Sequence, residues 1–221
     1  MLFLLPFLAI AVGYFAARFL CSMRPGVSYL LAFSGAFLLS VIFFELLPEL
    51  FLDNKGNASA GIMIGILFQI VLDYFSKGAE HGHVHQDKSS STFPLALLVS
   101  LSIHALVEGF PVAESNAVLM GVIIHKIPIA IILSLFLIES NLSRGKQGLF
   151  LIVFGLMTPL GTYLALYLPE LKPHLNFINA IAVGVFLHVA TTILFESSKD
   201  HQFNRIKLLM ILAGAFAGYM L

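Results

Sequence analysis

The stretch SIHALVEGFPVAESNAVLMGVIIHKIPIA, residues 102–130, decides how this chain folds. Two long apolar runs are joined by a short polar break, and each run belongs to a segment long enough to cross a bilayer as a helix. Ionisable residues stand inside both runs: His104 and Glu108 in the first, His125 and Lys126 in the second. Each such group is costly in hydrocarbon unless a partner compensates it. The stretch therefore predicts paired membrane helices around a polar centre.

The composition of the whole chain is that of an integral membrane protein. Of the 221 residues, 59% are hydrophobic and 11% are charged, and the mean hydropathy is +0.96. Such a chain is too apolar for the surface of a soluble domain. Its formal net charge of zero argues against a nucleic-acid partner, which needs a clustered basic face. The single cysteine, Cys21, excludes an intrachain disulfide and a cysteine-based metal cluster.

Apolar stretches separated by polar, glycine or proline breaks predict an all-α bundle of eight transmembrane helices, forming one transmembrane domain over residues 1–221. The predicted helices cover residues 2–20, 28–51, 60–75, 93–113, 117–138, 148–168, 177–195 and 206–221. The runs are continuously apolar rather than alternating, which disfavours a membrane β-barrel. No basic residue precedes the first run, so we expect a helix there rather than a cleavable signal peptide.

The distribution of Lys and Arg predicts the orientation of this bundle. One end carries Arg18, Arg24, Lys77, Lys88, Arg144, Lys146, Lys199, Arg205 and Lys207, and the other carries Lys55 and Lys172. The positive-inside rule makes the richer end cytoplasmic, so both termini are expected outside, on the extracellular or periplasmic side. Residues 78–92 then form a flexible cytoplasmic loop, whose His81, His83 and His85 are expected to bind a departing metal ion weakly.

His104, Glu108 and His125 form a candidate metal site. His104 and Glu108 are four residues apart, on one face of a helix and about 6 Å from each other. His125 is expected at a similar depth on the neighbouring antiparallel helix. Two imidazoles and a carboxylate suit zinc, iron(II) or manganese. The alternatives are histidines hydrogen-bonded across helices, with Glu108 bonded to one of them, or a proton relay through the carboxylate.

Further residues in apolar segments are candidates for a pathway. Glu45 and Glu49 lie four residues apart near the outer end of the second predicted helix, where they would attract cations or simply form a solvated helix end. His188 is expected to be a transient pathway ligand or a hydrogen-bonded buried histidine. Pro111 and Pro128 are expected to kink their helices beside the candidate site.

Several motifs in this chain resemble those of the ZIP (Zrt/Irt-like) divalent metal transporters. HALVEG at 104–109 and HKIPIA at 125–130 are similar to the fourth- and fifth-helix patterns of the family. FELLPEL at 44–50, PLG at 159–161 and FLHVATTILFES at 186–197 are similar to patterns of its second, sixth and seventh helices. The resemblance implies eight helices with both termini outside, a homodimer, and alternating access in which the first, fourth, fifth and sixth helices move against the others.

The chain departs from the family pattern at the positions of a second metal site. Ala105, Lys126, Ile129 and Thr158 stand where the resemblance leads us to expect asparagine or acidic residues. The chain therefore looks like a divergent bacterial-type member, with one ion held by His104, Glu108 and His125. We expect the Lys126 ammonium to stand in for the second ion, paired with Glu108 or another acceptor. The alternative is that Lys126 points away and snorkels.

The leading functional prediction is transport of a divalent transition metal into the cytoplasm, zinc first and iron or manganese next. The metal is the substrate, no cofactor is expected, and the lipid bilayer and a second copy of the chain are the expected partners. The bacterial inner membrane is the predicted location. Two alternatives are an intramembrane zinc hydrolase, in which the open metal position carries an activated water, and a metal sensor that does not transport.

Overall fold

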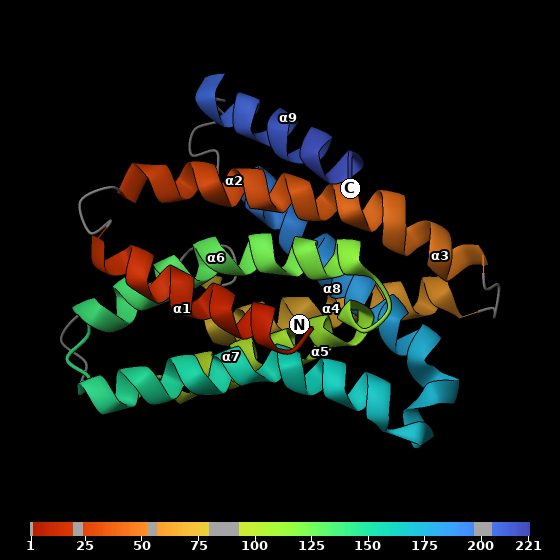
Figure 1. Ribbon diagram of the computed structural model, residues 1–221, viewed down its shortest axis with the longest axis horizontal. Coiled ribbons are helices and arrows are strands. Elements are labelled where there is room, and N and C mark those ends of the chain that lie inside the picture. Colours follow the sequence, from red (N-terminus) through yellow and green to blue (C-terminus); the bar gives the residue numbers. More distant parts are fainter. Residues whose placement is uncertain (1, 20–23, 53–56, 80–92, 197–204) are drawn as a thin grey trace.

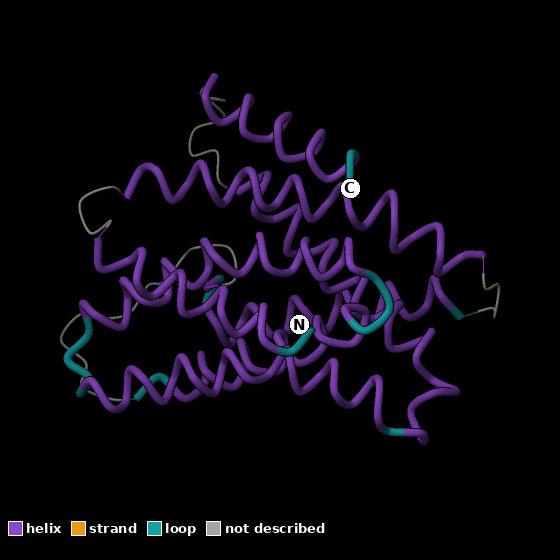
Figure 2. The backbone as a smooth tube through the Cα atoms, in the orientation of Figure 1, coloured by secondary structure: helices purple, strands orange, loops and turns teal. Residues whose placement is uncertain are grey.

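In the computed structural model of the chain, residues 2–19, 24–52, 57–79, 93–196 and 205–221 are described, and within them the backbone forms eight helical rods and no β-strand (Figure 2). The rods are α1 (Leu4–Phe19), α2 (Arg24–Val41) continued by η1 (Ile42–Leu46) and α3 (Leu47–Leu52), α4 (Ala58–Ser76), α5 (Leu95–Val112), α6 (Asn116–Glu139), α7 (Arg144–Tyr167), η3 (Pro169–His174) running into α8 (Leu175–Glu196), and α9 (Arg205–Tyr219). The predicted all-α, eight-helix fold is confirmed.

Length and apolarity qualify six of these rods as membrane spans. Among the described residues they are Gly26–Leu52, Ala58–Ser76, Leu95–Val112, Asn116–Glu139, Arg144–Tyr167 and Pro169–Phe195. The α1 and α9 helices are shorter, at 16 and 15 residues. Large apolar side chains such as Phe15, Leu67 and Leu209 are exposed on the outside of the bundle, where lipid solvates them. The chain is therefore a multi-pass membrane protein.

The helices run roughly parallel or antiparallel to the long axis of the molecule (Figure 1). The α9 helix packs on α2 along one edge, and α7 lies along the opposite edge. The end of α1, which carries Arg18, and the start of α7, which carries Arg144, lie at one end. The α3 helix and η3, which carries Lys172, lie at the other end. Which end faces the cytoplasm stays a prediction from charge.

Facing glycines set the closest helix contacts. Gly65 of α4 meets Gly184 of α8, and Gly109 of α5 meets Gly161 of α7. At all four positions an added Cβ would overlap a backbone carbonyl of the facing helix. Small residues that let two backbones touch are a principal source of helix association in membranes, where dispersion contacts replace the hydrophobic effect. The α4–α8 and α5–α7 pairs are therefore joined at the level of the backbone.

One turn of π-helix, η1, interrupts the second rod, a feature that the apolar pattern of the sequence does not predict. Pro48 lacks an amide hydrogen, and its ring would crowd the carbonyl one turn earlier in a regular helix. In the structure the preceding turn is widened, and the Leu47 amide donates to the carbonyl of Ile42, five residues back. Widened turns of this kind commonly accompany proline in a helix. The turn contains Glu45.

The start of α7 also differs from its prediction. The helix begins at Arg144 rather than at residue 148, because Ser143 has an extended backbone (φ −62°, ψ 148°) and forms the N-cap position. Hydropathy placed the start later because Arg144, Lys146 and Gln147 are polar. A polar first turn outside the apolar part of the bilayer is invisible to a search for apolar runs.

Gly65→Ala is expected to destabilise the protein by about 1–3 kcal/mol, because the new methyl group would meet a backbone carbonyl that cannot move aside. Gly148→Ala in α7 is the matched control, since a Cβ there meets nothing within 4 Å. The control should be neutral or stabilising by up to about 1 kcal/mol through helix propensity. Thermal unfolding in detergent measures both, and equal transition temperatures for the two variants would contradict the backbone contact.

Candidate functional site

A small cavity between α5 and α6 collects the residues that stood out in the sequence. Its polar walls are His104, Glu108, His125 and Lys126, and its apolar walls are Leu101, Ile129 and Phe154. The cavity volume is about 10 Å³, the space of roughly one water molecule. The fold thus brings the three predicted metal ligands and the Lys126 ammonium to one buried cavity.

Glu108 contacts side chains from three helices in this cavity. Its carboxylate is 1% exposed, and Oε1 forms an ion pair with the Lys126 ammonium. The Thr158 hydroxyl donates to the same oxygen over 2.6 Å. Oε2 lies 3.6 Å from Nε2 of His104. Partners from α5, α6 and α7 therefore compensate one buried charge, as burial in low dielectric requires.

Lys126 is buried as completely as its partner. Its side chain is 2% exposed, so the ammonium stays inside the bundle instead of snorkelling to an interface. Besides Glu108, the ammonium lies 4.8 Å from the ring centroid of Phe154 on α7, which is within the range of a cation–π contact. The carboxylate and the ring together hold the ammonium in the cavity.

Thr158 occupies the position where the family resemblance led us to expect glutamate. Its hydroxyl lies 3.0 Å from the carbonyl of Ala105 as well as 2.6 Å from Glu108. One turn later, the Thr162 hydroxyl donates to the Gly109 carbonyl over 2.8 Å. The family resemblance identifies Thr158 only as a missing ligand. Its role as a hydrogen-bond donor was missed because it depends on the close approach of α5 and α7.

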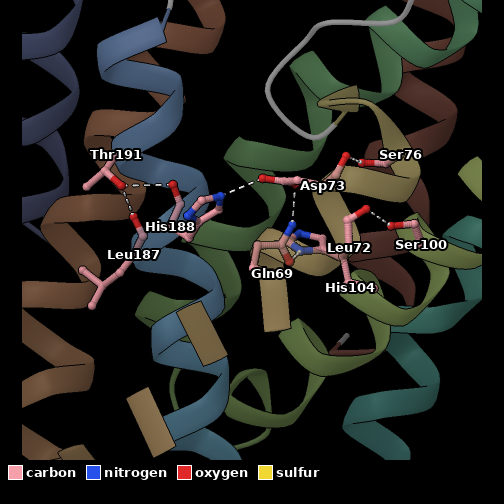
Figure 3. Close-up of polar contacts among 9 residues, drawn as sticks. All are labelled: Gln69, Leu72, Asp73, Ser76, Ser100, His104, Leu187, His188 and Thr191. Carbon is pink, nitrogen blue, oxygen red and sulfur yellow. Dashed lines mark hydrogen bonds and ion pairs between the residues drawn. The ribbon is translucent and has the colours of Figure 1, made fainter. Parts of the chain in front are cut away.

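The other side of His104 faces α4. Nδ1 of His104 lies 3.0 Å from Oε1 of Gln69, and the Gln69 amide nitrogen donates to Asp73 Oδ1 over 3.0 Å (Figure 3). Nε2 of His188 on α8 lies 2.7 Å from Asp73 Oδ2. Gln69 was not singled out in the sequence, although a fully buried amide in an apolar helix is itself a signal. His188 is thus hydrogen-bonded, as one of its two predictions expects. Its role as a pathway ligand stays a prediction.

The remaining candidates lie away from this cavity or outside the described residues. Glu45 in η1 and Glu49 in α3 are exposed, at the end of the second rod. Neither lines the cavity. Their role at an entrance stays a prediction. The histidines of the 78–92 loop, His81, His83 and His85, fall outside the described residues.

The cavity has the donor atoms of a metal site in a closed arrangement. Within the ranges that the structure describes, no three His, Cys, Asp or Glu side chains are gathered closely enough to hold a metal ion as they stand. His104, Glu108 and His125 line one cavity, but Oε1 of Glu108 is engaged by Lys126. Coordination by all three would require these side chains to move toward a common centre.

Comparison with known proteins identifies relatives for most of the chain. A family model described as ZIP Zinc transporter matches residues 72–221, which include α5 to α9 and the whole cavity. The chain is 29% identical over 168 residues to protein zntD of Dictyostelium discoideum, covering 64% of this chain and 24% of that protein. It is 25% identical over 176 residues to zinc transporter ZIP1 of Plasmodium falciparum, covering 73% and 49%. It is 29% identical over 158 residues to zinc transporter ZIP1 of Bos taurus, covering 62% and 49%. The aligned part therefore spans half or less of these relatives.

Lys126→Met is expected to destabilise the protein by about 3–5 kcal/mol, because it leaves the buried Glu108 carboxylate without its counter-charge. The double variant Glu108→Gln/Lys126→Met removes both charges and should recover most of that loss. Lys172→Met on the exposed η3 turn is the control and should stay within about 0.5 kcal/mol of wild type. Unfolding in detergent without added metal measures all of them. If the double variant is no more stable than Lys126→Met, the unpaired Glu108 charge is not the cause of the destabilisation.

Proposed function

The chain belongs to the ZIP family of zinc transporters, and on that premise we propose that it carries a divalent transition-metal ion, zinc first, across the membrane into the cytoplasm. The family is one of transporters, so this chain is not an enzyme and the intramembrane hydrolase is set aside. The choice of zinc over iron or manganese rests on the family description, because the same donor atoms bind all three.

One observation carries the proposed substrate site: His104, Glu108 and His125 line a single buried cavity between two membrane helices. Imidazole nitrogens and a carboxylate oxygen are the donors that zinc accepts when no thiolate is present. Nε2 of His104 and Oε2 of Glu108 are 3.6 Å apart. Two atoms that bind one tetrahedral zinc ion at its usual bond lengths are roughly 3.3 Å apart. The two atoms of this pair are therefore close to the spacing needed to bind the same ion. His125 supplies the third donor from the facing helix.

In this proposal Lys126 takes the place of a second metal ion. Glu108 divides its oxygens, with Oε1 on the Lys126 ammonium and Oε2 toward His104. A carboxylate that bridges two cations in a binuclear centre would divide its oxygens in the same way. The tethered ammonium thus supplies the positive charge on one side of Glu108 and leaves the other side for the transported ion.

The finer parts of the transport cycle follow from the same premise. The glycine contacts join α5 to α7 and α4 to α8, which fits two helix groups moving against each other. Glu45 and Glu49, exposed near the outer end of the second rod, are proposed to attract the ion. His188 is proposed to receive it on the way to the cytoplasm. A homodimer and location in the bacterial inner membrane complete the proposal.

Alanine substitution of His104, Glu108 or His125 is expected to reduce saturable zinc flux into proteoliposomes at least about 10-fold, because each removes a ligand. Ser34→Ala is the control: this buried hydroxyl donates to the Leu31 carbonyl within α2 and lies outside the cavity. Flux is normalised to folded protein. Zinc binding without flux in the wild type would favour the non-transporting sensor, and flux that survives all three substitutions would refute the proposed site.

Lys126→Ala is expected to abolish most of the zinc flux, because it removes the cation opposite the transported ion. Lys126→Arg keeps the positive charge and should retain a measurable part of the flux. The two variants are compared at equal amounts of protein that elutes as a single folded species from size-exclusion chromatography. Wild-type flux in Lys126→Ala would show that the ammonium is dispensable and would refute the stand-in role.

A further inference from the structure

A continuous hydrogen-bond chain runs from the cavity across three helices (Figure 3). It passes from His104 on α5 to Gln69 and Asp73 on α4 and ends at His188 on α8, with heavy-atom distances of 3.0, 3.0 and 2.7 Å. Gln69 is fully buried, and His104 is 3% exposed. Water is therefore kept from these two side chains, and the hydrogen bonds fix how each of them is oriented.

An ionised Asp73 sets the order of donors and acceptors along these hydrogen bonds. The Asp73 carboxylate only accepts hydrogen bonds, so the atom of Gln69 that faces it is the amide nitrogen. The Gln69 oxygen then faces His104, and because that oxygen only accepts, the proton lies on Nδ1 of His104. The neutral imidazole consequently carries its lone pair on Nε2, the atom that lies 3.6 Å from Glu108 Oε2.

This arrangement is the one that metal-binding histidines use. Such a histidine donates its second ring N–H to a carboxylate or carbonyl oxygen, which fixes the tautomer and ring orientation and makes the ligating nitrogen more basic. Here the acceptor is an amide oxygen, and the carboxylate of Asp73 polarises that amide from the far side. Gln69 is thus connected to the cavity through its hydrogen bond to His104, and Gln69 itself does not line the cavity.

We propose that Gln69, itself held by Asp73, is a positioning residue that fixes His104 as the Nδ1–H tautomer and thereby presents Nε2 to the transported ion. The inference rests on the proposed function for its consequence, because only a metal-binding His104 gives the tautomer a role in transport. The tautomer itself is a property of the metal-free protein. Gln69 acts through His104 and does not contact the ion.

The first test reads the tautomer without metal. In protein labelled with ¹⁵N-histidine and reconstituted in liposomes, the His104 signals are identified by their loss in His104→Ala, because the chain has 8 histidines. The wild type is expected to show His104 protonated at Nδ1, and Gln69→Met to shift the population toward Nε2 protonation. A wild-type His104 protonated at Nε2 would overturn the proposal, as would an unchanged tautomer in Gln69→Met.

The second test measures zinc affinity by competition with a chelating dye, together with the KM and maximal rate of zinc flux. Gln69→Met is expected to weaken zinc binding about 10–100-fold and to raise KM by a similar factor, with a smaller change in maximal rate. Ser100→Ala is the matched control, because it also removes a buried α5–α4 hydrogen bond, from Ser100 Oγ to the Leu72 carbonyl over 2.6 Å. It should leave the zinc affinity within a few-fold of wild type.

A rescue variant separates polarity from packing. Gln69→Glu combined with Asp73→Asn keeps an oxygen facing Nδ1 of His104 and keeps the net charge of the pair, so zinc affinity should return to within a few-fold of wild type. An affinity as low as that of Gln69→Met would overturn the positioning role. If wild type binds zinc through His104 but Gln69→Met binds equally well, only this inference fails. If wild type neither binds nor transports zinc, the proposed function fails, and the tautomer readout still decides the positioning of His104.

Discussion

The burial of one carboxylate constrains the centre of this bundle. Glu108 is almost completely removed from solvent, and an unpaired carboxylate at that depth would cancel a large part of the free energy that stabilises a fold. Lys126 from α6 supplies the charge, Thr158 from α7 supplies a hydrogen bond, and His104 supplies a neighbour on the same helix. Helices α5, α6 and α7 must therefore meet at one level, and this requirement fixes their register.

Backbone contact between α5 and α7 makes that arrangement possible. Gly109 and Gly161 allow the two helices to touch, so the short Thr158 side chain reaches both the Glu108 carboxylate and an α5 carbonyl. A larger residue at either glycine would separate the helices and leave the hydroxyl out of reach. The polar centre thus depends on the small-residue contacts, because these contacts set the distance between α5 and α7.

The sequence was sufficient for those features that depend on contiguous residues. Eight apolar runs predicted eight helices, and Glu108 and Lys126 stood out because each is a charged residue inside an apolar run. Gln69 and Thr158 were not recognised as partners, because the residues they contact lie 35 and 50 positions away along the chain. The π turn before Pro48 was missed for another reason: a proline predicts that the helix is disturbed but leaves the form of the disturbance open.

The contacts between α4 and α5 have a mechanical consequence. The His104–Gln69 and Ser100–Leu72 hydrogen bonds lie about one turn apart along the same pair of helices. Axial sliding of α5 along α4 would break both bonds together, because their partners on α4 move as one rigid row. The displaced helices would leave buried donors and acceptors unsatisfied, which costs free energy. These two hydrogen bonds therefore oppose axial sliding between α4 and α5.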